Sequence, residues 1–469
     1  MWSEALSHHG KYVLIMSVIS FGTMFQLGYV TAYPNTAFTE FRAFIYDSYE
    51  RRGVTLTENH FNWIWSVVLN LWYPGCIVGT WATPFVAERF GRKVGLIVGN
   101  AIDVIATGVN VVGLLTHLPE LVTVGRLLTG VGDGLAANCL TLFLQESAPT
   151  QIRGLVSGFQ ELSVTLSILI GMLFGLQYVL GESLWILTAV AAVPNCIAIF
   201  VMFFCPDTPK FLYLGKKSTI RATEALRFFH GTTHDVEECL QTISQESANE
   251  GKTSFREVWN SRSLRKAMLL GSVAFGLQLM TGTVPITLFS TELFRRAGFN
   301  SQGAEMGSII MAMLNCLATA LSLNFVDRCG RRLLLLVFGS LNVLSIAAYA
   351  LFAELSEVTT WAKYGCLAAM FSFTITFSFG LGPVPWYLTA ELVPQKQRSF
   401  IQSIAFSANT VAGLFTGLLT LPLYGYFDAY SFIPLFIIPS IICLIYLFRQ
   451  LPETKNKEIY EIVKELEAR

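Results

Sequence analysis

The sequence is short of charge. Only 14% of its 469 residues are Asp, Glu, Lys or Arg, whereas a soluble globular protein usually carries about 25%. With 53% hydrophobic residues, the chain has too little polar surface to cover itself in water. The 32 basic residues balance the 32 acidic residues, so no net charge attracts nucleic acid. These deficits argue against a soluble protein and against a nucleic-acid partner.

The nine cysteines lack the spacing of a metal or disulfide site. Most of them lie inside apolar runs, and none belongs to a C-x-x-C pair. We interpret them as small core residues, so neither a metal nor another cofactor is expected. Histidine is equally scarce in the apolar runs, with only His60 at the edge of one. Because a membrane enzyme would need a nucleophile–base or metal set at one depth, the sequence does not indicate an enzyme.

Long apolar runs fill most of the chain. A helix needs roughly 20 apolar residues to cross a bilayer core of about 30 Å, and windows of that length give twelve candidates. The first six lie at 12–33, 61–83, 94–115, 121–145, 154–177 and 184–205, and the second six at 267–290, 304–326, 332–353, 364–390, 400–421 and 429–449. The predicted fold class is therefore an all-α membrane protein with twelve transmembrane helices.

A polar stretch separates the two sets of runs. Within it, "IRATEALRFF" has the spacing of a short amphipathic helix. The predicted units are an N-terminal six-helix bundle at 1–206, cytoplasmic linker helices at 207–266, a C-terminal six-helix bundle at 267–451 and a cytoplasmic tail at 452–469. Basic residues follow spans two, four, eight and ten, on the same side as the linker and both termini. By the positive-inside rule, that side is cytoplasmic.

Three short motifs occur twice at almost the same offset. The pairs are "ESAPTQIR" at 146–153 with "ELVPQKQR" at 391–398, "RFGRK" at 89–93 with "RCGRR" at 328–332, and "PDT" at 206–208 with "PET" at 452–454. A constant offset indicates two homologous six-helix halves, related as parallel repeats about an axis along the membrane normal. A duplicated bundle around a central cleft is typical of carriers that work by alternating access.

Together these motifs resemble the sugar-porter branch of the major facilitator superfamily, most closely the facilitative glucose and fructose transporters of animals. The resemblance covers nearly the whole chain and rests on "ERFGRK", "GRLLTGVGDGL…ESAPTQIRG", "PDTPKFL", "DRCGRR", "GPVPW…AELVPQKQR" and "LPETK". It implies the major facilitator fold, in a multi-pass protein of the plasma membrane with both termini in the cytoplasm. The implied function is facilitative transport of a hexose or a related small solute by alternating access.

The resemblance also implies a cytoplasmic gate at the repeated motifs. Its residues are Arg89, Arg92, Glu146, Arg153, Arg328, Arg331, Glu391 and Arg398. They are expected to pair across the two halves when the carrier is open outward. A partly screened ion pair contributes about 0–1 kcal/mol, so a few pairs give a bias that thermal motion can reverse. The simpler alternative, that the basic residues only set the topology, does not explain Glu146 and Glu391.

Family members hold a hexose mostly through amide side chains, and this chain keeps only part of that set. By position, the substrate-binding candidates are Glu161, Gln278, Asn315, Trp386, Asn409 and Thr410. Glu161 stands where the family has a glutamine, and Thr410 where it has a tryptophan. A hydrogen bond contributes about 0.5–1.5 kcal/mol, so losing several amides weakens a hexose site. The substrate is therefore a hexose held by new partners, or a non-sugar solute such as a polyol or a urate-like compound.

The sequence leaves more than one function and mechanism open. A site that lacks several of the family's amide side chains also suits a sugar sensor, which keeps the fold of a transporter but does not transport the sugar. Glu161 either replaces the family glutamine as a neutral acid or stays ionised and selects cationic or donor-rich solutes. Proton-driven sugar porters carry an acid on the first helix where this chain has Val30, so passive uniport is expected. The intramembrane acids Asp103 and Asp133 are expected to have structural roles.

Overall fold

The computed structural model is helical, with no strand in the part of the chain that it describes. That part is the whole chain except residues 1, 150–151, 153–155, 157, 232–236, 238, 242, 244–254, 357, 394, 455–461, 463 and 467–469. The α-helices are α1 (Trp2–Thr36), α2 (Phe38–Glu50), α3 (Glu58–Asn70), α4 (Trp72–Phe90), α5 (Arg92–Leu115), α6 (Pro119–Ser147), α8 (Phe159–Phe174), α9 (Leu184–Ala189), α10 (Ala192–Phe204), α11 (Thr219–His230), α13 (Phe255–Asn260), α14 (Arg262–Met280), α15 (Thr283–Arg296), α16 (Ser301–Cys329), α17 (Arg331–Leu355), α18 (Ala362–Thr376), α19 (Val384–Leu392), α20 (Gln395–Phe427) and α21 (Ile438–Gln450).

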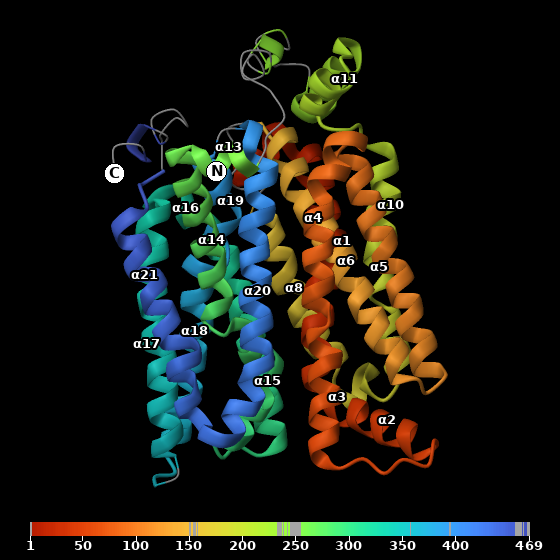
Figure 1. The fold of residues 1–469 in the computed structure, drawn as a ribbon, viewed down its shortest axis with the longest axis vertical. Coiled ribbons are helices and arrows are strands. Elements are labelled where there is room, and N and C mark those ends of the chain that lie inside the picture. Colours follow the sequence, from red (N-terminus) through yellow and green to blue (C-terminus); the bar gives the residue numbers. More distant parts are fainter. Residues whose placement is uncertain are drawn as a thin grey trace.

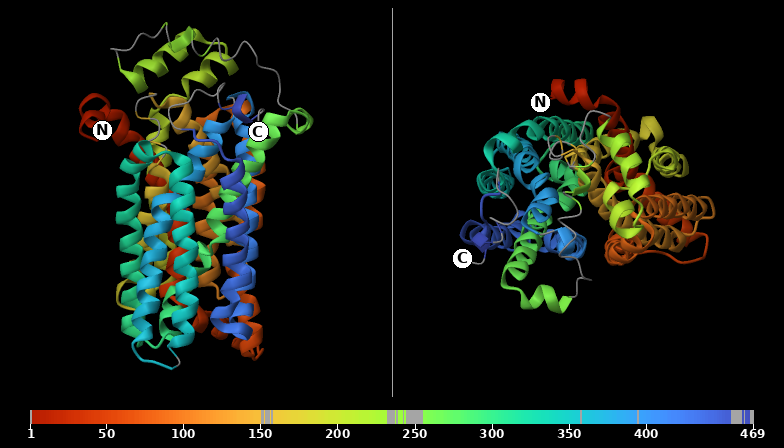
Figure 2. Two further views of the ribbon diagram at one scale, coloured as in Figure 1. Left: turned by 90° about the vertical axis from the view of Figure 1, so that its left-hand side faces the viewer. Right: turned by 90° about the horizontal axis from the view of Figure 1, so that it is seen from above.

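The helices form two groups that lie side by side. Figure 1 shows the helices up to α10 on one side of the molecule and those from α14 onward on the other. α11 lies beyond one end of the bundle, the end at which α1 starts and α21 finishes (Figures 1 and 2). We call this end the motif end, because the repeated motifs lie there, and the opposite end the α2 end.

The membrane-crossing segments agree with the twelve predicted spans. Ten helical segments within the described residues are long and apolar enough to cross a membrane. The predicted span at 61–83 is divided between α3 and α4 by a turn at Leu71. Pro74 explains the division, because it has no backbone N–H to bond the Asn70 carbonyl. The predicted span at 154–177 corresponds to the shorter α8.

Interrupted helices meet near the middle of the bundle. α14 gives way to α15 at Gly282, whose φ of +78° lies in the left-handed region that glycine adopts without strain. α18 continues into a π-helical turn at Phe377–Leu381 before α19 begins. Such breaks are tolerated at membrane depth where the backbone is buried in protein or lines a cavity. They therefore mark where a cavity is to be sought.

Helices α4 and α6 lie so close that their backbones touch. The Cα atoms of Gly75 and Gly79 face the backbone of α6, and those of Gly130 and Gly134 face the backbone of α4. A Cβ atom at any of the four would overlap a carbonyl oxygen of the other helix. Small residues at a spacing of four permit this approach between membrane helices. We call this contact the glycine seam.

The linker and the tail each pack onto one half at the motif end. On α11, Phe229 lies edge-on to Tyr12 and Phe143, with ring centroids 6.0 and 5.9 Å away. In the tail, Ile462 and Leu466 are buried in the core of the C-terminal half. The predicted linker at 207–266 thus contains α11 and α13, and it also includes the start of α14.

Candidate functional site

A cavity of about 1040 Å³ lies between the two halves. We call it the central cavity. Its polar lining side chains are Thr31, Arg126, Glu161, Thr165, Gln278, Thr283, Thr287, Asn315 and Asn409, and its aromatic ones are Trp72, Tyr73, Phe377, Trp386 and Phe406. Small-molecule sites usually combine an apolar lining with a few polar groups, so this cavity suits a small organic solute.

Glu161 joins the two halves inside the cavity. It lies in the first turn of α8, and its Oε2 accepts a hydrogen bond from Nε1 of Trp386 on α19, over 3.0 Å. Both side chains are 5% exposed. The other carboxyl oxygen lies against the backbone, since a Cβ atom at Gly382 would be 2.8 Å from Oε1. The absence of a side chain at Gly382 therefore leaves room for the carboxyl group of Glu161.

The amide side chains of the cavity are bonded to one another and to the backbone. Nδ2 of Asn409 donates to Oε1 of Gln278 over 2.8 Å, and Nε2 of Gln278 donates to the carbonyl of Gly382 over 2.8 Å. Oδ1 of Asn315 accepts from the hydroxyl of Ser378 over 2.7 Å. Part of the hydrogen-bonding capacity of these amides is therefore already used within the protein.

Five of the six candidate substrate residues line the cavity, and Thr410 does not. Thr410 is buried on α20, where its hydroxyl donates to the carbonyl of Phe406 over 2.9 Å. Its Oγ1 also lies 3.8 Å from Sγ of Cys76 on α4. Thr410 therefore contacts the other half behind the cavity wall.

Arg126 lines the cavity although the sequence did not identify it as a site residue. Nη1 of Arg126 donates to the carbonyl of Val30 over 3.0 Å. A signal was available, because an ionisable side chain inside an apolar span is a functional candidate by default. Its helix neighbour Asp133 instead accepts from Nε1 of Trp72 over 2.7 Å, behind the wall.

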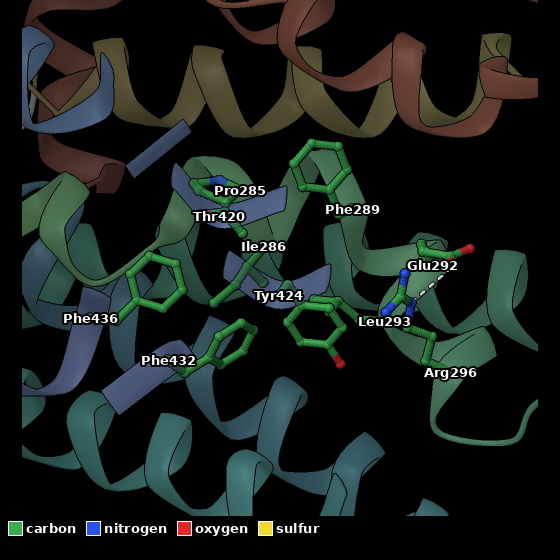
Figure 3. Close-up of a pocket in the computed structure, with 10 residues that line it drawn as sticks. All are labelled: Pro285, Ile286, Phe289, Glu292, Leu293, Arg296, Thr420, Tyr424, Phe432 and Phe436. Carbon is green, nitrogen blue, oxygen red and sulfur yellow. Dashed lines mark hydrogen bonds and ion pairs between the residues drawn. The ribbon is translucent and has the colours of Figure 1, made fainter. Parts of the chain in front are cut away.

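Helix α15 separates the central cavity from a smaller hollow. One face of α15 lines the central cavity. α15 is also bonded to the N-terminal half, because Nδ2 of Asn35 on α1 donates to the Thr287 carbonyl over 3.0 Å and to the Ser290 hydroxyl over 2.9 Å. The other face lines the hollow of Figure 3, where Arg296 pairs with Glu292 over 3.0 Å and lies over the Tyr424 ring. This hollow lies within the C-terminal half, so it does not join the two halves.

At the motif end, the repeated residues of the N-terminal half form one network. Nη2 of Arg92, at the start of α5, lies 2.8 Å from Oε1 of Glu146, near the end of α6. Oε2 of Glu146 accepts from the Thr208 hydroxyl over 2.7 Å. Asp207 accepts from the backbone N–H of Lys93 over 3.2 Å, in the first turn of α5. We call Arg92, Glu146, Asp207 and Thr208 the N-terminal network.

The C-terminal half repeats the arrangement. Nη2 of Arg331 lies 3.0 Å from Oε1 of Glu391, whose Oε2 accepts from the Thr454 hydroxyl over 2.5 Å. Glu453 accepts from the backbone N–H groups of Arg331 and Arg332, over 2.9 and 3.2 Å. We call Arg331, Glu391, Glu453 and Thr454 the C-terminal network.

These two ion pairs join residues of the same half, and the expected pairing of gate residues across the halves stays a prediction. The pairing within one half is local, because α5 and α6 are neighbours in one bundle and bring Arg92 to the end of α6. Of the other gate residues, Arg89 is exposed, with its guanidinium over the rings of Phe85 and Phe90. Arg398 is half-buried in the first turn of α20. Arg153 and the side chain of Arg328 lie outside the described residues.

The sequence of the chain matches a known family over almost its whole length. Residues 15–466 match the family model described as "Sugar (and other) transporter". The chain belongs to this transporter family.

Within the described residues, no group of three His, Cys, Asp or Glu side chains is placed to hold a metal ion.

Relatives of this transporter include facilitative carriers of mammals. The dog protein "Solute carrier family 2, facilitated glucose transporter member 3" is 28% identical over 463 residues, covering 97% of this chain and 92% of the relative. Member 5 of the same family from cattle is 28% identical over 456 residues, covering 96% of this chain and 91% of the relative.

The fold of the transporter is that of the major facilitator superfamily. The proton:xylose symporter XylE, solved with 6-bromo-6-deoxy-D-glucose, superimposes with a TM-score of 0.83 over 98% of this chain and 99% of the symporter, at 20% identity. An inward-open structure of XylE from E. coli gives a TM-score of 0.74 over 97% of this chain and 99% of the symporter, also at 20% identity. The predicted fold class is thus confirmed: two homologous six-helix bundles in a multi-pass membrane protein.

Proposed function

We propose that the protein is a facilitative transporter that moves a hexose or a related small organic solute across a membrane by alternating access. The central cavity carries this proposal, because it lies between two homologous halves and both halves supply lining side chains. Five of the six substrate-binding candidates line it. Hydrogen bonds cross between the halves from Trp386 to Glu161 and from Asn35 to Thr287 and Ser290, and these bonds would exchange during a transport cycle.

Transport is proposed to be passive uniport. The position of the coupling acid in proton-driven relatives holds Val30, and Arg126 donates to the Val30 backbone instead of pairing with a carboxylate there. Purified protein in liposomes should therefore carry labelled solute down its gradient, at a rate that does not change when a proton gradient is added or dissipated. Accumulation against the solute gradient, driven by protons, would contradict uniport and leave the transporter assignment intact.

The motif end is proposed to face the cytoplasm of a cell whose plasma membrane holds the protein. This orientation follows from the basic residues of the repeated motifs, which lie at the same end as α11. The two halves are proposed to move as the units at 1–206 and 267–451, with the linker at 207–266 and the tail at 452–469 held to them.

A sugar sensor is the second candidate function. The mutual hydrogen bonds of Gln278 and Asn409 favour it, because a pre-bonded pair has less capacity for a hexose. Labelled uptake into liposomes separates the two candidates. A sensor binds glucose, seen as thermal stabilisation of the purified protein, without moving it, whereas a carrier exchanges it across the bilayer.

A further inference from the structure

Glu161 places a carboxyl group in the central cavity, and no basic side chain of the described residues forms an ion pair with it. Its Oε2 instead accepts a hydrogen bond from the neutral indole of Trp386, over 3.0 Å. Arg126 lines the same cavity but bonds the Val30 carbonyl. A buried charge without a counter-charge is costly, so a ligand that supplies a positive charge gains more at Glu161 than a neutral one does.

Aromatic rings surround this carboxyl group. Trp386 and Phe406 line the cavity together, with ring centroids 5.3 Å apart and planes tilted by 41°. Phe377 lies at the same place as the carboxyl group, since a Cβ atom at Gly382 would be 3.3 Å from the Phe377 ring and 2.8 Å from Oε1 of Glu161. Aromatic faces attract cations through the ring quadrupole, and the attraction grows when the site excludes water. A carboxylate among aromatic rings is therefore suited to an ammonium group.

The presence of Glu161 where related sugar porters have a glutamine also favours a positively charged ligand. The glutamine of related sugar porters both donates and accepts hydrogen bonds, whereas an ionised glutamate only accepts. A sugar hydroxyl needs one acceptor, but an ammonium group offers three donors and a charge. Charge-assisted hydrogen bonds are roughly twice as strong as neutral ones.

Arg126 gives the cavity an opposite charge at a different depth. α6 begins at the α2 end, and Arg126 lies two turns into it. α8 begins at the motif end, and Glu161 lies in its first turn. The cavity therefore carries a basic side chain toward the α2 end and an acidic one toward the motif end.

We propose that the solute is an organic amine with hydrogen-bond acceptors at its far end, such as an amino sugar. The ammonium group binds Glu161 between the rings of Trp386, Phe377 and Phe406, and hydroxyl or carbonyl oxygens face Arg126. This inference rests on the proposed transport function and narrows its substrate class.

The test is uptake into liposomes of three labelled probes that differ at one position: glucosamine, N-acetylglucosamine and glucose. At a pH at which the amine is protonated, glucosamine should be carried with a kcat/KM at least about tenfold above both neutral probes, because the charge-assisted bond is absent from them. Glu161→Gln should remove this preference, so that the ratio of glucosamine uptake to glucose uptake falls at least about tenfold. Glu50→Gln, at an exposed acid of α2, is the matched control and should keep the preference.

The outcomes separate the inference from the function on which it rests. Transport of glucose with no preference for glucosamine overturns the amine proposal and leaves the transporter standing. The same holds if Glu161→Gln keeps the preference. If no probe moves, the proposed function fails as well. The comparison of the three probes on the unmodified protein decides the matter even if the variant does not fold.

Discussion

The N-terminal and C-terminal networks share the same pattern of hydrogen bonds and ion pairs, but their glutamate side chains are buried to different degrees. In the N-terminal network, the side chains of Arg92 and Glu146 are 13% and 6% exposed. In the C-terminal network, Arg331 is again 13% exposed, but Glu391 is 28% exposed. The carboxylates that hold the helix starts differ too, since Asp207 accepts one backbone N–H of α5 and the longer Glu453 accepts two of α17.

The comparison shows what the duplication has kept. Each half keeps an arginine at a helix start, a glutamate near a helix end and a short segment that closes the gap between them. Because all these bonds lie within one half, they stabilise that half as a rigid body. Bonds that cross between the halves, such as that of Glu161 with Trp386, are expected to exchange between conformations.

Loss of the buried carboxylate should have the largest effect. Glu146→Ala leaves Arg92 without its partner in a nearly closed site, and removing one member of a buried pair costs about 3–5 kcal/mol. We expect a large fall in the melting temperature of the purified protein. The double variant with Arg92→Ala should lose less than the sum of the two single variants, because the two residues are coupled. An unchanged melting temperature for Glu146→Ala would mean that the pair is not structural.

The equivalent change in the C-terminal half should cost less. Glu391→Ala removes the equivalent bonds to Arg331 and Thr454, but the greater exposure of this site lets water solvate the remaining charge. We expect a loss of roughly 1–3 kcal/mol, the range for leaving a polar partner unsatisfied. The measurement is the same thermal unfolding, made side by side with Glu146→Ala. Equal losses in the two variants would show that burial does not set the difference between the networks.

Asp207→Asn should have the smallest effect. Burial raises the pKa of Asp207 above its usual value, although the Thr208 and Lys93 amides oppose the shift. The asparagine oxygen can still accept from the Lys93 N–H, so we expect a loss within about 1 kcal/mol at neutral pH. A raised folded-state pKa means that the folded protein binds the proton more tightly than the unfolded chain. The stability of the natural protein relative to Asp207→Asn should therefore fall as pH rises from about 4, the usual Asp value, through the folded-state pKa. A stability difference that rises with pH would contradict this reading.

Composition and repetition predict most of this fold. Spans of twenty apolar residues need no knowledge of packing, and repeated motifs reveal the two halves because a duplicated gene keeps its turns. The break between α3 and α4 was missed, since hydropathy does not register the lost N–H of Pro74. Arg126 was not identified, and Thr410 was expected in the site although it does not line the central cavity, for a related reason: which face of a helix meets the cavity depends on tertiary packing. The pairing of Arg92 with Glu146 likewise follows from the neighbouring placement of α5 and α6, which a linear motif does not contain.

The glycine seam limits how this sequence can drift over generations. At Gly75, Gly79, Gly130 and Gly134 even alanine, the smallest step available, places a carbon atom where the other helix has a carbonyl oxygen. Compensation by a second substitution is not available, because the obstacle is backbone and no mutation makes a carbonyl smaller. Inherited variants at these four positions should therefore be found among damaging alleles, whatever solute the carrier moves.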